Sequence, residues 1–140
     1  MSEDRTLLAR ASARLGEVDY AVDLQAGKHR LVADEPASRG GNNAGPAPFA
    51  LVLSGLAACT AITLRMYAQR KGWNLEAVDV EAQLFRLGPE FHIDRSISLH
   101  GKLDAEQAGR LLEMSEKTPV TLALKGGVDI RTTLDQPGPV

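Results

Sequence analysis

Cys59, the only cysteine of the chain, is the side chain best suited to nucleophilic chemistry. It lies in the small and apolar run Ser54–Leu64, SGLAACTAITL. A free cysteine often packs as a small hydrophobe, and it becomes reactive where a cation, backbone N–H groups or a helix N-terminus stabilise the thiolate. Arg65, six positions on, is too far along a helix to do so. Residue types alone therefore favour packing and leave a reactive thiol as the alternative.

A cation that activates Cys59 would have to come from another part of the chain. The candidates are the arginines of the N-terminal segment and of the loop after it: Arg5, Arg10, Arg14 and Arg39. The spacing of these arginines in the sequence does not indicate which of them approaches Cys59.

The other chemistries that the residue types suggest find little support. His92 and His100 would be about 26 Å apart in one strand, and His29 stands apart from both, so we expect no metal site and no cofactor. The run Gly40–Gly45 lacks the Gly-Lys-Ser/Thr ending of a phosphate-binding loop, so a flexible loop is favoured over an anion site. Ser54-Gly55 does not form the G-x-S-x-G motif of serine hydrolases.

The composition predicts one soluble domain over residues 1–140, with a frayed tail at about 134–140. The chain is 44% hydrophobic and 24% charged, with a net charge of −2, which gives no reason to expect nucleic-acid binding. One cysteine cannot form a disulfide within the chain. The most apolar run, residues 49–56, is shorter than the ~20 residues of a membrane span. We therefore expect a cytoplasmic protein that does not enter a membrane.

The N-terminal half predicts an antiparallel meander followed by one long helix. Residues 7–14, 20–24 and 29–33 read as strands, and the Gly- and Pro-rich residues 34–48 must form a loop. A helix follows over 49–71, with Gly72 at the position of a left-handed C-cap. Because this helix is apolar on all sides as far as residue 62, we expect it to be buried, with a partner chain covering part of it.

The C-terminal half predicts a hairpin, two helices and a last strand. Residues 78–85 and 91–99 alternate as strands, and Asp104 begins a helix with a capping box to Gln107. Thr118-Pro119 starts a further short helical turn, and residues 128–132 read as a strand. The predicted class is α+β: an antiparallel sheet with a long buried central helix.

Two segments together resemble a known family. The loop ending in Gly45-Pro46-Ala47-Pro48 leads into a helix that carries Ala57-Ala58-Cys59-Thr60. Downstream follows ISLHGKLDAEQAGRLLEMSEKTPV. These segments resemble the OsmC/Ohr family of osmotically induced and organic-hydroperoxide-resistance proteins, in the branch of OsmC-like predicted redox proteins. The resemblance covers about residues 20–133.

The resemblance implies an intertwined homodimer and a thiol peroxidase mechanism. In the family a helix cysteine attacks a hydroperoxide, and Cys59 matches it. An N-terminal arginine holds the thiolate, for which we choose Arg14. The second cysteine of the family precedes a Pro-Val pair, where this chain has Thr118, and the glutamate expected near Ala50 or Phe49 is absent. Because Thr118 cannot form a disulfide, a two-cysteine cycle within the chain is impossible.

Two functions therefore remain open. The first is a stress-response redox protein in which Cys59 reduces organic hydroperoxides with the help of an external thiol. The alternative is a non-catalytic module of the same fold that binds a small apolar ligand, with Cys59 as core packing.

Overall fold

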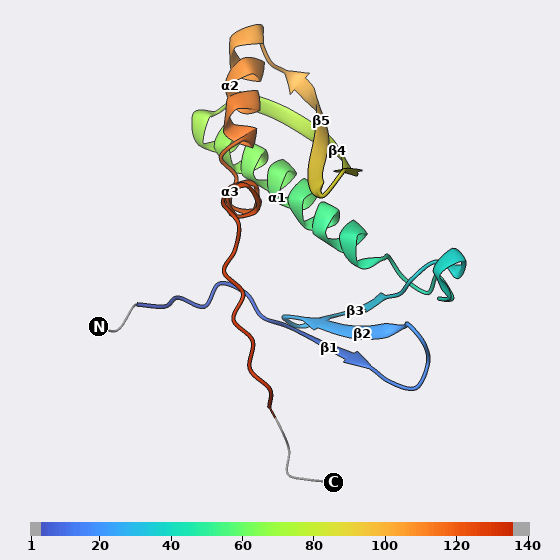
Figure 1. Ribbon diagram of the computed structural model, residues 1–140. Helices are drawn as coiled ribbons and strands as arrows, with labels where there is room; N and C mark the ends of the chain where they lie inside the picture. The colour runs from blue at the N-terminus through green and yellow to red at the C-terminus, as the bar shows by residue number, and fades with distance from the viewer. Residues whose placement is uncertain (1–3, 136–140) are drawn as a thin grey trace. The chain divides into compact units, whose positions relative to one another are not determined.

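A computed structural model describes residues 4–135 (Figure 1). The chain divides into two compact units at the boundary between Ser54 and Gly55. The single domain over 1–140 stays a prediction, and most of the expected frayed tail lies outside the described residues.

The N-terminal unit contains a three-stranded antiparallel meander, as predicted. Its strands are β1 (Ala11–Leu15), β2 (Val22–Ala26) and β3 (His29–Ala33), in the order β1-β2-β3. The first strand begins later than the predicted 7–14. Among the described residues of this unit, the buried ones are Ala33, Asp34 and Gly41. The meander therefore has almost no apolar core of its own.

The loop after β3 is held together by the carboxylate of Asp34, which is 2% exposed. Its Oδ1 accepts a hydrogen bond from the N–H of Glu35 at 2.7 Å, and its Oδ2 accepts from Ala44 at 3.0 Å and Asn42 at 3.2 Å. The Ala44 N–H contributes most to lowering the pKa of this carboxyl below its usual range; the other N–H groups add to this, while burial opposes it. These hydrogen bonds link Asn42 and Ala44 to the start of the loop, and the flexibility of the loop stays a prediction.

Helix α1 (Pro48–Lys71) is the long helix that the sequence predicts, and Gly72 follows it in the left-handed region at φ 71°. Within one chain it buries one face only: Leu56, Thr60, Leu64, Tyr67 and Ala68. By length and composition its 24 residues could span a membrane, although the core helix of a soluble protein passes the same test. Apolar side chains on the other faces, such as Ile62 and Met66, are more than half exposed.

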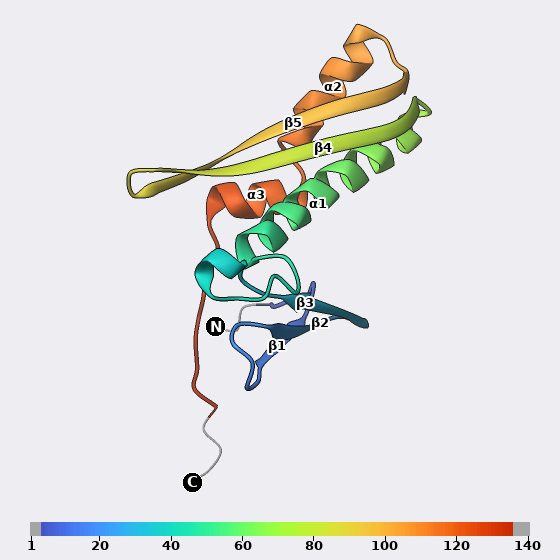
Figure 2. The ribbon, with the colours of Figure 1, turned by 90° about the vertical axis from the view of Figure 1, so that its right-hand side faces the viewer.

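The C-terminal unit is built on a long hairpin of β4 (Asn74–Leu87) and β5 (Glu90–Lys102), joined at Gly88 with φ 60°. Figure 2 shows the hairpin beside α1 and α2. Val78, Ile97 and Leu99 of the hairpin pack against a core of α1, α2 and β4 residues: Leu64, Tyr67, Ala68, Leu75 and Leu111. Both strands extend beyond the predicted 78–85 and 91–99.

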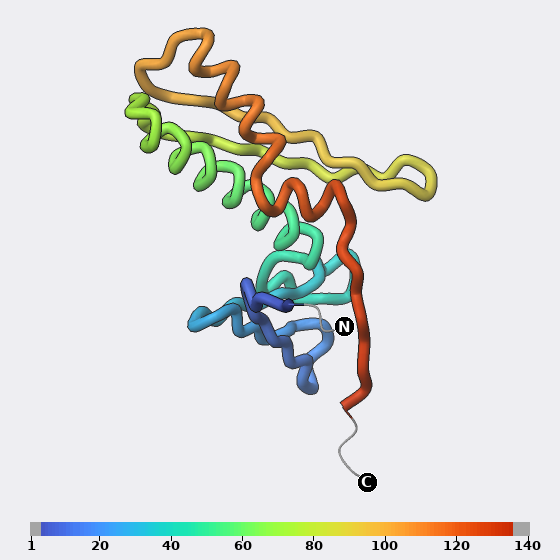
Figure 3. The backbone as a smooth tube through the Cα atoms, turned by 90° about the vertical axis from the view of Figure 1, so that its left-hand side faces the viewer, coloured from blue at the N-terminus to red at the C-terminus, as the bar shows by residue number. Residues whose placement is uncertain are grey.

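Two short helices complete this unit. Helix α2 (Ala105–Ser115) has the predicted capping box between Asp104 and Gln107, and α3 (Pro119–Gly126) has Thr118 as N-cap. The predicted strand at 128–132 is wrong, because these residues form no helix or strand in the described part of the chain. Figure 3 shows their irregular course after α3. A strand needs an edge to pair with, and the alternating pattern alone does not supply one.

Candidate functional site

Cys59 lies in the middle of α1 and is half-buried. Its Sγ is 3.9 Å from Thr63 Oγ1, one helical turn further on. The nearest arginine along the helix, Arg65, instead donates a 2.7 Å hydrogen bond to the carbonyl oxygen of Glu76. Cys59 thus lies on the predicted long helix, and Arg65 is directed towards β4.

Arg14, the predicted partner of the thiolate, lies in β1 opposite Asp23 and is exposed. It belongs to the N-terminal unit, whereas Cys59 belongs to the C-terminal unit. Their pairing stays a prediction.

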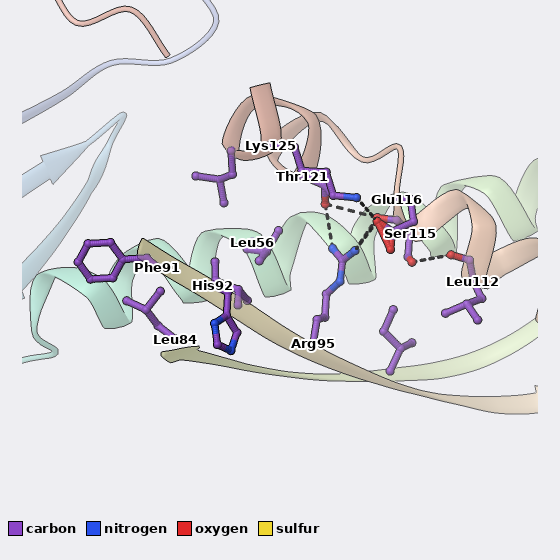
Figure 4. A pocket seen from close by; sticks show the side chains of 13 residues that line it. Leu56, Leu84, Phe91, His92, Arg95, Leu112, Ser115, Glu116, Thr121 and Lys125 are labelled. Carbon is purple, nitrogen blue, oxygen red and sulfur yellow. Dashed lines mark hydrogen bonds and ion pairs between the residues drawn. The ribbon is translucent and has the colours of Figure 1, made fainter. Parts of the chain in front are cut away.

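The structure reveals a different arginine, Arg95 of β5, which the sequence reasoning missed. Its side chain is 11% exposed. Its Nη1 donates to Thr60 Oγ1 at 2.9 Å and to Thr121 Oγ1 at 2.8 Å, while Nη2 donates to the carbonyl oxygen of Ser115 at 3.0 Å. One guanidinium therefore joins α1, next to Cys59, to the end of α2 and to α3. Figure 4 shows Arg95 beside Ser115, Glu116 and Thr121.

A sequence signal for this arginine did exist. Ile93, Arg95, Ile97 and Leu99 share one face of β5, and all four are half-buried. An arginine within an apolar row at strand spacing must find hydrogen-bond partners inside the fold. Its partners come from segments distant in the sequence, so the pattern could indicate a buried cation without naming its contacts.

Thr118, at the position where the family has its second cysteine, is fully buried next to this arginine cluster. Its Oγ1 lies 2.6 Å from Thr121 Oγ1 and accepts a 3.3 Å hydrogen bond from the Thr121 N–H. Thr118, Thr121, Arg95 and Thr60 thus form a continuous hydrogen-bonded chain from the start of α3 to α1. A thiol is a weaker hydrogen-bond donor and acceptor than a hydroxyl group, so a cysteine at position 118 would support these hydrogen bonds less well.

A cavity of about 600 Å³ opens beside Arg95, within the C-terminal unit. Its size is in the usual range for a small-ligand site. One end of the lining has Leu56, Leu84 and Phe91 together with the imidazole of His92, and the other end is charged, with Arg95, Glu116 and Lys125 (Figure 4). Cys59 is not among the lining residues, although Leu56 lies one helical turn before it.

Glu116 occupies the charged end of this cavity. Its Oε2 forms an ion pair with Lys125 Nζ and lies 3.8 Å from Arg95 Nη2. The hydrogen bond from Lys125 is the main cause that lowers the pKa of Glu116; partial burial opposes it, and the charges of Lys125 and Arg95 reinforce it. The carboxylate is therefore ionised at neutral pH.

Within residues 4–135, no group of three or more His, Cys, Asp or Glu side chains is placed to hold a metal ion. His100 instead pairs with Asp79 across the hairpin at 2.7 Å. The site consists of a thiol, an arginine whose side chain is 11% exposed and bound by threonines, and an amphipathic cavity.

Comparison with known sequences decides the family. Residues 40–133 match the family described as OsmC-like protein, which is well over half of the chain. The chain belongs to this OsmC-like family. The match includes both Cys59 and Thr118. A search of curated proteins finds no match.

Solved structures share the fold of this OsmC-like protein. An OsmC-like protein from Mycoplasma pneumoniae has a TM-score of 0.74 and 21% identity, covering 87% of this chain and 90% of its own. A Legionella pneumophila structure is described as an organic hydroperoxide resistance protein OsmC and predicted redox protein; its TM-score is 0.65 at 22% identity, covering 90% and 95%. The organic hydroperoxide resistance protein OhrB of Bacillus subtilis has a TM-score of 0.61 at 24% identity, covering 88% and 94%. These similarities confirm the predicted α+β class.

Proposed function

We propose that this OsmC-like protein reduces organic hydroperoxides through Cys59, using an external thiol as reductant. The observation that carries the proposal is the place of the single thiol. It is half-buried on α1, beside the residue that the buried Arg95 binds. Solved structures of the same fold from Legionella pneumophila and Bacillus subtilis are described as organic hydroperoxide resistance proteins.

The chemistry requires two steps. The Cys59 thiolate attacks the terminal oxygen of R–O–O–H; an S–O bond forms as the O–O bond breaks, and the leaving alkoxide takes a proton to give the alcohol. Cys59 becomes a sulfenic acid. A reductant thiol then attacks its sulfur and releases water, and a second thiol displaces the mixed disulfide to regenerate Cys59. Thr118 cannot replace the external thiol, because it has no sulfur.

A homodimer belongs to the proposal. The exposed apolar side chains of α1 and the meander without a core both need a cover that one chain's described residues do not provide. An intertwined dimer would also give an N-terminal arginine, such as Arg14, a route to the thiolate. We place the protein in the cytoplasm, where thiol reductants are abundant.

The cavity favours a second candidate function, the binding of a small apolar ligand without catalysis. Its lining includes Leu56 and Arg95 and leaves out Cys59. In this alternative the sulfur only packs, and hydroperoxides are not substrates.

The test compares wild type with Cys59→Ser in the consumption of cumene hydroperoxide with excess dithiothreitol. We expect turnover in wild type and its loss in the variant, and intact mass should show one added oxygen when the reductant is omitted. Thr63→Val, which keeps the thiol and removes the hydroxyl 3.9 Å away, is the control and should retain turnover. Equal rates of hydroperoxide consumption by wild type and Cys59→Ser would end the peroxidase proposal and leave the binding module.

A further inference from the structure

We propose that a second cavity, between the C-terminal part of α1 and α2, binds a phosphate group through Tyr67, Lys71 and Arg110. The group is either free phosphate or a phosphate monoester. The cavity measures about 640 Å³ and lies within the C-terminal unit. It shares no lining residue with the cavity beside Arg95, and Cys59 is not part of it. The inference therefore goes beyond the proposed peroxidase.

Tyr67 brings a nearly buried phenol to the wall of this cavity. The residue is 7% exposed, and its oxygen accepts a 2.9 Å hydrogen bond from Arg110 Nε. No residue among 4–135 accepts the proton of the same hydroxyl. A buried hydroxyl with an unused donor favours a ligand oxygen as its partner.

Three cations surround this phenol. The guanidinium carbons of Arg70 and Arg110 are each 5.9 Å from the ring centroid of Tyr67, and Lys71 Nζ is 5.7 Å from it. The hydrogen bond from Arg110 does most to lower the pKa of the Tyr67 phenol; burial opposes this, and the charges of the three cations add to it. The surroundings of the hydroxyl are therefore electropositive.

Much of this positive charge has no carboxylate partner in the described part of the chain. Arg110 Nη1 donates to Glu113 at 2.8 Å, whereas its Nη2 has no acceptor among residues 4–135. Over the same residues, neither Arg70 nor Lys71 forms an ion pair. Three cations against the single carboxylate of Glu113 leave two positive charges beside the Tyr67 hydroxyl.

A phosphate group fits these donors better than a carboxylate does. A phosphate monoester carries a charge of about −1.5 to −2 at neutral pH and has three strong acceptor oxygens. It therefore matches two unpaired positive charges and donors on three side chains. The open Nη2 edge of Arg110 suits phosphate oxygens, and Lys71 adds a point charge.

The acidic side chains of the lining limit where this anion can lie. Asp104 accepts the capping hydrogen bond from the Gln107 N–H, and Glu106 has no partner among the described residues. Both acids precede Arg110 by one turn of α2 or more. They would repel a phosphate at the start of that helix, so we expect the anion at the Tyr67 end of the cavity.

The test titrates inorganic phosphate, glycerol 3-phosphate and glycerol into the full-length protein at constant ionic strength. Trp73 is the chain's only tryptophan and lines the cavity, with its ring centroid 5.7 Å from that of Tyr67, so its fluorescence reports on the site. We expect a saturable change with the two phosphate compounds and none with glycerol. Tighter binding of glycerol 3-phosphate would identify the ligand as an ester, and equal or weaker binding would identify it as free phosphate.

Three variants test the named groups. Tyr67→Phe keeps the ring and removes the hydroxyl, and it should weaken glycerol 3-phosphate binding about tenfold, as for a hydrogen bond to a charged group. Lys71→Gln should weaken it about threefold, because Lys71 is exposed and its charge is screened. Glu106→Gln should strengthen it about twofold, because an exposed carboxylate that repels the phosphate is removed.

The chain offers a matched control for each change. Tyr20→Phe alters the other tyrosine, which lies in the N-terminal unit, and Lys117→Gln alters an exposed lysine outside the lining. Both controls should bind glycerol 3-phosphate as wild type does, and thermal denaturation checks that every variant is folded.

Three outcomes would overturn the inference. They are an unchanged Trp73 emission together with an unchanged phosphorus NMR line width of phosphate, equal responses to glycerol and glycerol 3-phosphate, and undiminished binding by Lys71→Gln. Cys59→Ser should bind glycerol 3-phosphate as wild type does. A failure of phosphate binding therefore leaves the peroxidase proposal standing, and a loss of hydroperoxide turnover leaves the phosphate site standing.

Discussion

Thr60, the residue after the cysteine, shows how closely the buried polar groups of this protein are matched. Its hydroxyl donates to the carbonyl oxygen of Leu56 at 2.7 Å and accepts from Arg95 at 2.9 Å. On α3, the hydroxyl of Thr121 likewise accepts a hydrogen bond from Arg95. Among the described residues that are not exposed, no buried side-chain nitrogen or oxygen lacks a hydrogen-bond partner. The arginine is therefore fixed from several directions, and so is the backbone beside Cys59.

Removing one acceptor from this cluster should be costly. Thr121→Val keeps the shape of the side chain and leaves an N–H of Arg95 without its 2.8 Å partner. We expect a loss of about 1–3 kcal/mol in the free energy of unfolding, measured by urea denaturation. Thr63→Val, which loses only a weak contact to sulfur, should lose less than about 1 kcal/mol. Equal losses in the two variants would show that the arginine does not depend on Thr121.

At the scale of the elements, the loop between β3 and α1 depends on close approach of the backbone. A Cβ on Gly45 would collide with the carbonyl oxygen of Val32, and one on Gly41 with that of Glu35. Neither contact can be relieved by a side-chain rotation, because both involve the backbone.

Gly45→Ala should therefore destabilise the protein by about 1–3 kcal/mol or more, as in overpacked interiors. Gly16→Ala is the matched control, since nothing lies within 4 Å of a Cβ there. Thermal denaturation of both variants checks the difference, and a Gly45→Ala protein as stable as the Gly16→Ala control would contradict the packing of this loop.

The same loop should loosen in acid. The pKa of Asp34 is lowered in the folded protein, so its contribution to stability is present above its usual value of 3.8 and is lost as the pH falls through the folded pKa. Hydrogen exchange of the Ala44 and Asn42 amides should accelerate, relative to the intrinsic rate, below about pH 3.8. In Asp34→Asn the two amides should already be less protected at neutral pH. Unchanged protection in that variant would argue against the carboxylate as the link.

The ends of α1 and the starts of α2 and α3 could be predicted from the sequence because local capping residues determine them, whereas most strand boundaries could not. Pro48 and Gly72 bound α1, Asp104 and Gln107 cap α2, and Thr118 begins α3. The Arg95 cluster could not be predicted, because it joins residues of α1, β5, α2 and α3 that only the tertiary fold brings together. Residues 128–132 alternate as a strand would, but a strand also requires a neighbouring edge, which the local pattern does not provide.

At the scale of the whole molecule, α1 presents an apolar surface that one chain leaves open. Val52, Ile62 and Met66 are 44%, 53% and 58% exposed, and a Cβ on Gly55 would meet nothing within 4 Å. In a lone chain, Gly55→Leu would be harmless and could stabilise α1 by up to about 1 kcal/mol.

If two copies pack here, as we propose, Gly55→Leu and Ile62→Asp should both weaken the dimer. We expect wild type to sediment as a dimer at micromolar concentration and the variants to shift towards the 15.0 kDa monomer. Lys117→Asp, at an exposed position outside α1, is the control and should remain dimeric. A monomeric wild type would contradict the proposal.

The meander has almost no apolar core of its own, and this affects how a newly synthesised chain folds. The N-terminal segment emerges from the ribosome first, and a domain with a core of its own can fold while synthesis continues. Here Ala33 is the one buried apolar side chain among residues 4–54, so the first third of the protein gains little by folding early. If two copies pair, as we propose, that third would remain open to proteases until the second copy binds.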